Sequence, residues 1–156
     1  MYKIRVIWLG KSQETYVRDG INLYTKKLTP YVKTELQELK AAPYSTGMLQ
    51  QNRQDETRKV ITLLEPGETS VFLDENGSVW SSVQLSQWFE QQKRVQFSRI
   101  NFLIGGAYGW AQELIPQGAL KLSLSPMTFN HQMVRIILLE QIYRAFTILN
   151  GEPYHH

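Results

Sequence analysis

Phe102-Leu103-Ile104-Gly105-Gly106-Ala107-Tyr108-Gly109 is the most informative stretch for the architecture of this chain, because it joins a short apolar strand to a glycine-rich turn. A ligand at the carboxyl end of a parallel strand needs backbone without obstructing side chains, and glycine permits that approach. We therefore expect a valine at position 106 to fill such a site. The Gly-Gly-x-x-Gly spacing matches neither the dinucleotide fingerprint nor the phosphate loop with its Lys and Ser/Thr. Considered alone, the turn fits a ligand site and a tight connection that binds nothing equally well.

Strands and helices alternate on both sides of this stretch. Short apolar or alternating runs predict five strands, at Lys3 to Leu9, Val32 to Leu39, Ser70 to Leu73, Ile100 to Ile104 and Lys121 to Leu124. Helical spacing predicts helices at Tyr16 to Leu28, from after Ala42 to near Leu64, from Ser81 or Ser82 onward, briefly from Ala111, and up to Asn150-Gly151. Asn76-Gly77 is a turn signal. This order predicts one α/β domain over residues 1–156, a three-layer sandwich around a mostly parallel sheet of five to six strands.

The composition excludes several classes of function. At 156 residues, with 42% hydrophobic residues, the chain suits one domain whose core needs no disulfide. Zero cysteines exclude thiolate chemistry, and with only 3 histidines we expect no metal site. No apolar run approaches the roughly 18 residues of a membrane span, and the start of the chain does not look like a signal peptide. We therefore expect a cytoplasmic protein with no membrane partner. A net charge of +3 is too small to establish RNA binding alone.

A second informative region lies near the end of the chain. It comprises Leu122-Ser123-Leu124-Ser125-Pro126-Met127-Thr128-Phe129-Asn130-His131-Gln132-Met133-Val134-Arg135, then Leu139 to Phe146, and the tail Glu152-Pro153-Tyr154-His155. Together with the glycine turn and the opening strand, these segments resemble the ribosomal RNA large subunit methyltransferase H family, the smallest SPOUT methyltransferases. The resemblance spans the whole chain and is weakest at about residues 40–60.

The resemblance implies a fold and a cofactor. The fold would contain a deep C-terminal trefoil knot, which periodicity alone never indicates. The cofactor would be S-adenosyl-L-methionine, the donor substrate, bound without a metal in a pocket of backbone groups and apolar side chains. Matching positions for that pocket are Leu73, Gly105, Gly106, Leu124, Ser125, Pro126, Met127, Thr128 and Phe129. Asn130 departs from the family, whose members commonly have proline there, so the path from this loop into the last helix is expected to differ slightly.

The last helix is apolar around most of its circumference. On a helical wheel Glu140, Arg144 and Thr147 form one narrow polar stripe, so we expect this helix to be covered by a second copy in a homodimer. The family resemblance implies a homodimer independently. His131 and Arg135 share one face near the helix start. Two interpretations stay open for them: a helix cap with a structural ion pair, or cations that face the substrate.

The resemblance also implies a reaction, namely methylation at N3 of a pseudouridine in the helix 69 loop of large-subunit rRNA, within the assembled ribosome. The tail would lie over the active site at the dimer interface. Arg135 would then orient the base or a phosphate, His155 or His131 would assist proton removal, and Tyr154 would stack or hydrogen-bond; Arg144 is a further candidate. A disordered tail is the alternative, and His155-His156 also resembles the start of a purification tag.

Two other classes of protein fit parts of the sequence. A Rossmann-type nucleotide enzyme would need a phosphate-binding loop after the first strand, and Leu9-Gly10-Lys11-Ser12 lacks the full motif. A non-catalytic ribosome-binding module could share the fold and the dimer without performing chemistry. Binding of S-adenosylmethionine distinguishes the methyltransferase from both.

Overall fold

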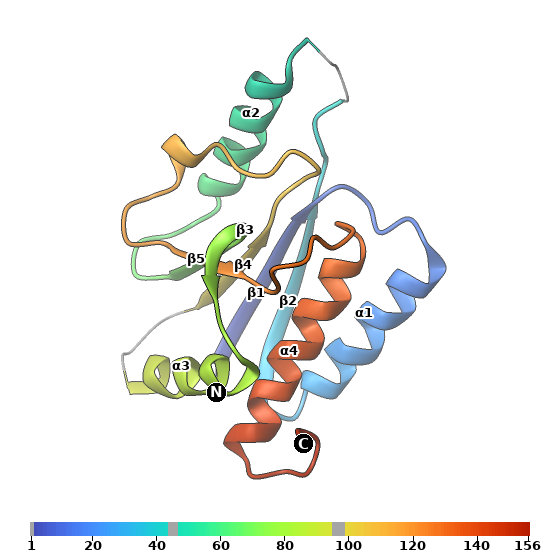
Figure 1. Cartoon of the computed structure of the whole chain (residues 1–156), viewed down its shortest axis with the longest axis vertical. Coiled ribbons are helices and arrows are strands. Elements are labelled where there is room, and N and C mark those ends of the chain that lie inside the picture. The colour runs from blue at the N-terminus through green and yellow to red at the C-terminus, as the bar shows by residue number, and fades with distance from the viewer. Residues whose placement is uncertain (1, 44–46, 95–98) are drawn as a thin grey trace.

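The computed structural model describes residues 2–43, 47–94 and 99–156. Strands and helices alternate along the chain (Figure 1). The elements are β1 (Tyr2–Leu9), α1 (Thr15–Leu28), β2 (Val32–Leu39), α2 (Leu49–Ile61), β3 (Thr69–Val79), α3 (Ser82–Arg94), β4 (Ile100–Ile104), the 3-10 helix η1 (Gln112–Leu114), β5 (Leu120–Ser123) and α4 (Met133–Leu149). Each predicted strand and helix is present, with bounds that agree to within a few residues except for the start of α2 and the end of β3. The expected start of α2 falls partly on residues 44–46, outside the described residues.

The five strands form one sheet in the order β2-β1-β4-β3-β5, and all four strand pairs are parallel. The predicted α/β class and parallel sheet are thus confirmed. The carboxyl ends of β1, β4 and β3 lie side by side, because Trp8 is in register with Ile104 and Leu73 is in register with Ile104 on the other side. This edge is where α/β proteins bind ligands.

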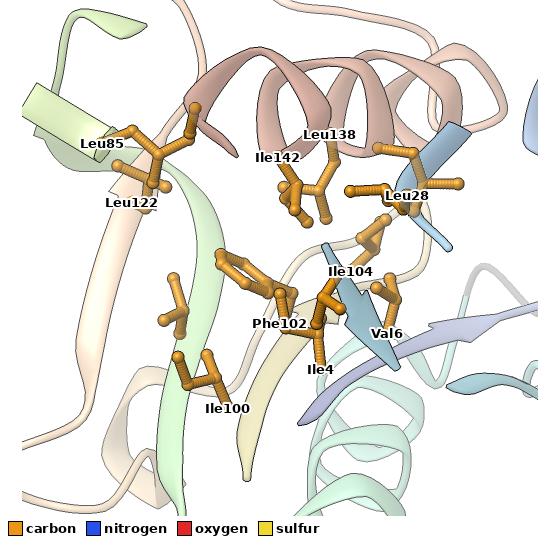
Figure 2. Close-up of a cluster of buried hydrophobic side chains, with 14 of the residues drawn as sticks. Ile4, Val6, Leu28, Leu85, Ile100, Phe102, Ile104, Leu122, Leu138 and Ile142 are labelled. Carbon is orange, nitrogen blue, oxygen red and sulfur yellow. The ribbon is translucent and has the colours of Figure 1, made fainter. Parts of the chain in front are cut away.

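Alternation along β1 divides the protein into layers. Ile4, Val6 and Trp8 belong to the larger core under α1, α3 and α4, whereas Ile7 and Leu9 belong to the smaller core with α2. Figure 1 shows α1, α3 and α4 on one face of the sheet and α2 on the other. Figure 2 shows the larger core, in which side chains of the sheet face those of the covering helices.

Helix α4 packs between α1 and α3 and approaches α1 closely. A Cβ on Gly20 would stand 2.8 Å from the Cδ1 of Ile136, so glycine is required where the two helices cross. Helix α3 begins with a capping box, in which Ser81 Oγ accepts from the Gln84 N–H at 3.1 Å and Gln84 Oε1 accepts from the Ser81 N–H at 2.8 Å. The sequence predicts Ser81 or Ser82 as the cap of this helix, and Ser81 is the residue that caps it.

Strand β3 is longer than the sequence predicts. Asn76-Gly77 lies inside Thr69–Val79, in an irregularity where Leu122 of β5 pairs with both Leu73 and Ser78. A Cβ on Gly77 would stand only 2.6 Å from the Lys121 carbonyl carbon, so the glycine allows β5 to approach. The same Asn-Gly pair that ends a strand in a hairpin here forms a bulge, because β5 continues the ladder beyond it.

At the amino-terminal end of the sheet a buried polar cluster joins three segments. Arg5 donates to Asn101 Oδ1 at 2.8 Å and to the Leu63 carbonyl at 2.8 Å, and it forms an ion pair with Glu68 at 3.2 Å. Asn101 donates to the same Glu68 oxygen at 2.9 Å. These partners satisfy charges that would otherwise be costly to bury. In the described part of the chain, no helix is long and apolar enough to cross a membrane. The trefoil knot stays a prediction from the family resemblance.

Candidate cofactor pocket and active site

A pocket of about 570 Å³ lies at the carboxyl ends of β4 and β5, beside residues 73–76 of β3. Its walls come from the glycine turn after β4, the bulge of β3, and the loop that joins β5 to α4. Leu73, Ile104, Leu122 and Leu124 supply apolar surface, and the backbone of residues 105–109 supplies polar groups. A pocket of this size and mixed lining suits a nucleoside-sized molecule.

The residues predicted to bind the cofactor come together here although they lie up to 56 positions apart in the chain (Leu73 to Phe129). Eight of the nine line the pocket, namely Leu73, Gly105, Gly106, Leu124, Ser125, Met127, Thr128 and Phe129. Pro126 lies in the same loop and is not among the lining residues that the structure describes. His131 lines the pocket as well, at the end of the loop.

A Cβ on either glycine of the turn would meet a neighbouring side chain. A Cβ on Gly105 would lie 3.2 Å from the Trp110 ring, and a Cβ on Gly106 would lie 2.6 Å from Glu56 Oε2. A valine at position 106 would therefore press on Glu56, and the expectation that it fills the pocket stays a prediction. Close packing behind the turn explains both glycines.

Trp110, which the sequence patterns did not single out, holds the turn against β3. Its Nε1 donates to the Leu73 carbonyl at 2.9 Å, and its ring packs edge-on against Phe72 with centroids 5.1 Å apart. The backbone N–H of the next residue, Ala111, donates to the buried Thr57 hydroxyl at 3.0 Å. The pocket wall is thereby fixed from two elements, β3 and α2.

Short-range hydrogen bonds shape the late loop. Ser125 Oγ accepts from the Met127 N–H at 2.9 Å, and Ser123 Oγ donates to the Ser125 carbonyl at 2.9 Å. The Met127 side chain is 75% exposed, so its apolar surface is available to a ligand or partner. Asn130, where the family commonly has proline, accepts from the Gln132 N–H through Oδ1 at 2.7 Å. This Asx turn leads the chain into α4.

Gln132 then ties the loop to the segment after β1. Its Nε2 donates to the Lys11 carbonyl at 2.9 Å, and its Oε1 accepts from the Gln13 N–H at 3.3 Å. Gln132 is buried, so these bonds replace water. The entry of α4 is consequently positioned by contacts 119 and 121 residues away in sequence, which no local pattern reveals.

Arg135 is 1% exposed and lies inside the protein. Its guanidinium donates to the Leu9 carbonyl at 3.0 Å and to Ser12 Oγ at 2.9 Å, and it stacks over the Trp8 ring at 5.2 Å. Burial lowers the pKa of the guanidinium, and the charge of Glu38 opposes that shift. Among the described residues, these contacts hold Arg135 inside the protein without the ion pair that the structural alternative expected. Its role towards a substrate stays a prediction.

The tail folds back along α4. Tyr154 donates to Glu140 Oε1 at 3.1 Å and packs on the Tyr143 ring, with centroids 4.8 Å apart. His155 Nδ1 lies 3.3 Å from Arg144 Nη1. Burial, and then hydrogen bonding with Tyr24 and the nearby Glu140 carboxylate, raise the pKa of Tyr154 well above its usual range. The phenol therefore stays protonated near neutral pH.

The tail does not line the pocket of its own chain. Arg144, which His155 contacts, is about ten residues further along α4 than Val134, a pocket residue, which corresponds to roughly 15 Å along a helix. The predicted catalytic residues thus fall into separate places: His131 lines the pocket, Arg135 is buried against Leu9 and Ser12, and Tyr154 and His155 lie along α4 at Glu140 and Arg144. Thr147, expected on the polar stripe of that helix, is instead fully buried and donates to the Arg144 carbonyl at 2.7 Å.

Known proteins resemble the chain over nearly its full length. Residues 2–155 match the family described as "Predicted SPOUT methyltransferase". The chain belongs to the SPOUT methyltransferase family. It is 41% identical over 154 residues to the ribosomal RNA large subunit methyltransferase H of Geotalea daltonii, covering 99% of each chain. Proteins of the same name from Acetivibrio thermocellus, 43% identical over 157 residues and covering 98% of this chain and 99% of the relative, and Parabacteroides distasonis, 39% identical over 155 residues and covering 99% of each, are similar too.

Membership makes this protein an enzyme that transfers a methyl group, and a SPOUT methyltransferase takes a donor of the S-adenosylmethionine type. Gly105 and Gly106 line the pocket together with Leu73, Leu122 and Leu124. Among the described residues, no group of three His, Cys, Asp or Glu side chains is placed to hold a metal ion.

Proposed function

We propose that this SPOUT methyltransferase uses S-adenosyl-L-methionine to methylate N3 of a pseudouridine in the helix 69 loop of large-subunit rRNA. The single observation that carries the proposal is the pocket beside β3 and at the carboxyl ends of β4 and β5, lined by eight of the nine residues that match the family's cofactor positions. The names of the full-length relatives support rRNA of the large subunit as the substrate.

The residues of the pocket fit the proposed donor. Leu73, Leu124 and Met127 offer apolar surface for the two faces of the adenine, and the backbone of the turn and loop offers hydrogen bonds for its edge. Asp74 and Glu75 add negative charge at the wall formed by β3, which suits a ligand that carries cationic groups. Bound there, the donor would supply an electrophilic methyl group on a positively charged sulfur.

The active site is proposed to be completed in a homodimer. The outward side of α4 carries Met133, Ile137 and Ile148, which are exposed or half-buried apolar residues. A second copy seated on this surface would cover them and would bring the partner's tail towards the pocket. That arrangement supports catalytic roles for Tyr154 and His155, which lie outside the pocket of their own chain.

The roles of individual residues follow from their chemistry. N3 of the base carries a proton between two carbonyl groups, and this proton must leave as the methyl group is transferred. His155 or His131 is proposed to accept it, because Tyr154 stays protonated and serves to stack or to donate a hydrogen bond. Arg135 donates hydrogen bonds to the Leu9 carbonyl and to Ser12 Oγ near the start of α4. In the proposal it also orients the base or a phosphate.

The substrate is proposed to be the assembled ribosome, and the enzyme accordingly to work in the cytoplasm. A net charge of +3 supplies little general attraction to RNA, so recognition would draw on the shape and composition of the whole particle. We expect weak binding to an isolated helix 69 hairpin.

Calorimetry with S-adenosylmethionine tests the proposal. The expected result is one ligand per subunit, competed by S-adenosylhomocysteine, together with transfer of a tritiated methyl group to ribosomes that lack the modification. Cofactor binding without transfer to those ribosomes would refute the proposed substrate. Ribosome binding with no cofactor binding would instead identify a non-catalytic ribosome-binding module, and binding of a dinucleotide would favour the Rossmann alternative.

A further inference from the structure

Glu56 of α2 carries a buried carboxyl group, and in the described structure only one of its two oxygens accepts a hydrogen bond. The residue is 2% exposed. Its Oε1 accepts from the Ala42 N–H at 3.0 Å, whereas the buried Oε2 has no hydrogen-bond partner among the residues that the structure describes. A glutamate that served packing alone would leave this oxygen at a considerable cost in free energy. The position therefore calls for an explanation beyond the fold.

The unpartnered oxygen points at the back of the glycine turn. It lies 2.6 Å from the place where a Cβ on Gly106 would stand, so only a glycine separates the carboxyl group from the pocket. Gly106 itself lines the pocket, and Glu56 does not. A ligand that rests on the turn would therefore be close to Glu56, with only the backbone of the turn between them. The buried surroundings of Glu56 hold little water to screen a charge.

The other charges around Glu56 leave it without a close counter-ion. On α2, Lys59 is exposed and donates to the Lys40 carbonyl at 3.0 Å, and Arg53 lines the pocket one turn earlier. From other elements, Asp74 and Glu75 of β3 and His131 of the late loop line the same pocket. Burial raises the pKa of Glu56, and the Ala42 hydrogen bond and Lys59 oppose that shift. A cation placed on the turn would add the missing favourable charge.

We propose that Glu56 is a positioning residue that senses the charge of the methyl donor through the glycine turn: a sulfonium cation in the pocket shifts Glu56 from its carboxylic acid form towards its carboxylate form. In that step the carboxyl O–H bond breaks and the proton passes to solvent, with no change of oxidation state. The uncharged thioether product favours ionisation less. The inference rests on the proposed function and adds to it a means of selecting donor over product.

Proton release on binding is the direct test. Calorimetric titrations of S-adenosylmethionine and of S-adenosylhomocysteine in buffers with different heats of ionisation, between pH 5.5 and 7.5, measure the protons released per ligand. The wild type is expected to release more protons with the sulfonium than with the thioether, and its preference for the sulfonium should rise with pH by about tenfold for each unit by which the ligand lowers the pKa. Glu56→Gln should remove both the difference and the pH dependence.

A matched variant separates Glu56 from the other ionisable groups of the pocket. His131→Gln should keep the difference in proton release between the two ligands. If Glu56→Gln keeps it and His131→Gln loses it, the proposal is wrong. Should Glu56→Gln fail to fold, carbon-13 NMR of glutamate carboxyls in the wild-type protein replaces it, with ionisation on addition of S-adenosylmethionine expected and an unchanged protonation state overturning the inference. Failure of the proposed function would differ from both, since neither ligand would then bind.

Discussion

Arg144 Nη1 lies 3.3 Å from His155 Nδ1, and this contact joins the tail to the last helix. A guanidinium only donates hydrogen bonds, so it holds the imidazole through a ring nitrogen that can accept one. Arg144 is in turn held by Glu140, whose Oε1 accepts from Nε at 3.0 Å and from Nη2 at 2.6 Å. The tail is therefore ordered on its own chain before any partner or substrate arrives.

Replacement of His155 by alanine tests the tail as part of the catalytic machinery. Cofactor affinity should stay close to wild type, because the tail does not line its own pocket, while methyl transfer should fall by about a hundredfold, the scale for a lost acid or base. Tritium incorporation into unmodified ribosomes from pH 6 to 9 measures the effect. His156→Ala, an exposed neighbour, is the matched control and should be fully active. Full activity of His155→Ala over that range would assign proton removal to His131 or to solvent.

Arg135 is expected to be important for stability whatever it does for the substrate. Arg135→Ala removes two hydrogen bonds and leaves the buried Leu9 carbonyl without this donor, so the free energy of unfolding should fall by about 3 kcal/mol. Urea denaturation measures this loss. Arg58→Ala, which loses only an exposed ion pair with Asp55, should change stability by about 0.5 kcal/mol or less. Equal effects of the two variants would contradict the structural role.

Gly106→Ala should perturb the glycine turn from behind. The added Cβ would stand 2.6 Å from Glu56 Oε2, so the buried carboxyl group or the turn must shift, at a cost of about 1–3 kcal/mol. Cofactor affinity, measured by calorimetry, should fall together with stability. Gly47→Ala, with nothing within 4 Å of the new Cβ, is the control and should behave like wild type. In the double variant Gly106→Ala, Glu56→Ala, the shorter side chain at position 56 should restore much of the stability. If the double variant is no more stable than Gly106→Ala, another contact causes the loss.

The pH dependence of stability should reveal Glu56. Because burial raises the pKa of Glu56 in the folded protein, the folded state holds a proton that the unfolded chain releases, and stability falls as pH rises from the ordinary value of 4.5 towards the folded pKa. Relative to Glu56→Gln, the wild type should lose about 1.4 kcal/mol for each tenfold difference in proton affinity between the two states. Urea titrations at pH 4 to 7 give the comparison. A difference between the two proteins that is constant with pH would exclude a shifted Glu56.

Dimerisation through α4 predicts a specific sensitivity to charge. Ile137→Asp places a carboxylate on the outward side of the helix, where a partner copy would have to bury it, and should produce monomers at micromolar concentration. Light scattering measures the mass. Met48→Asp changes an exposed apolar residue beside α2, on the other face of the sheet, and should leave the mass unchanged. A wild-type protein that is already monomeric at this concentration would refute the proposed dimer.

Local pattern was sufficient wherever a residue's role depended on its neighbours in the chain. The strands Val32–Leu39 and Ile100–Ile104 have the predicted bounds, because alternation or a short apolar run is enough to define a strand. Asn76-Gly77, predicted as a turn, is the opposite case, because its structure depends on a distant segment. The chemistry of that pair suits a turn, and pairing with Leu122 of β5, far along the chain, is what extends the strand through it.

By itself the sequence determined the alternation of strands and helices and the parallel sheet, which follow from periodicity, and the family resemblance of its motifs pointed to eight of the residues that line the pocket. Only the tertiary structure decided what stands behind that pocket. Glu56 occupies the space that a side chain at Gly106 would need. Arg135, a candidate for orienting the substrate, donates hydrogen bonds to the Leu9 carbonyl and to Ser12. The physical reason is that burial and hydrogen-bond partners depend on which distant segments pack together, and a polar residue has the same local pattern whether it faces solvent, a ligand or the core.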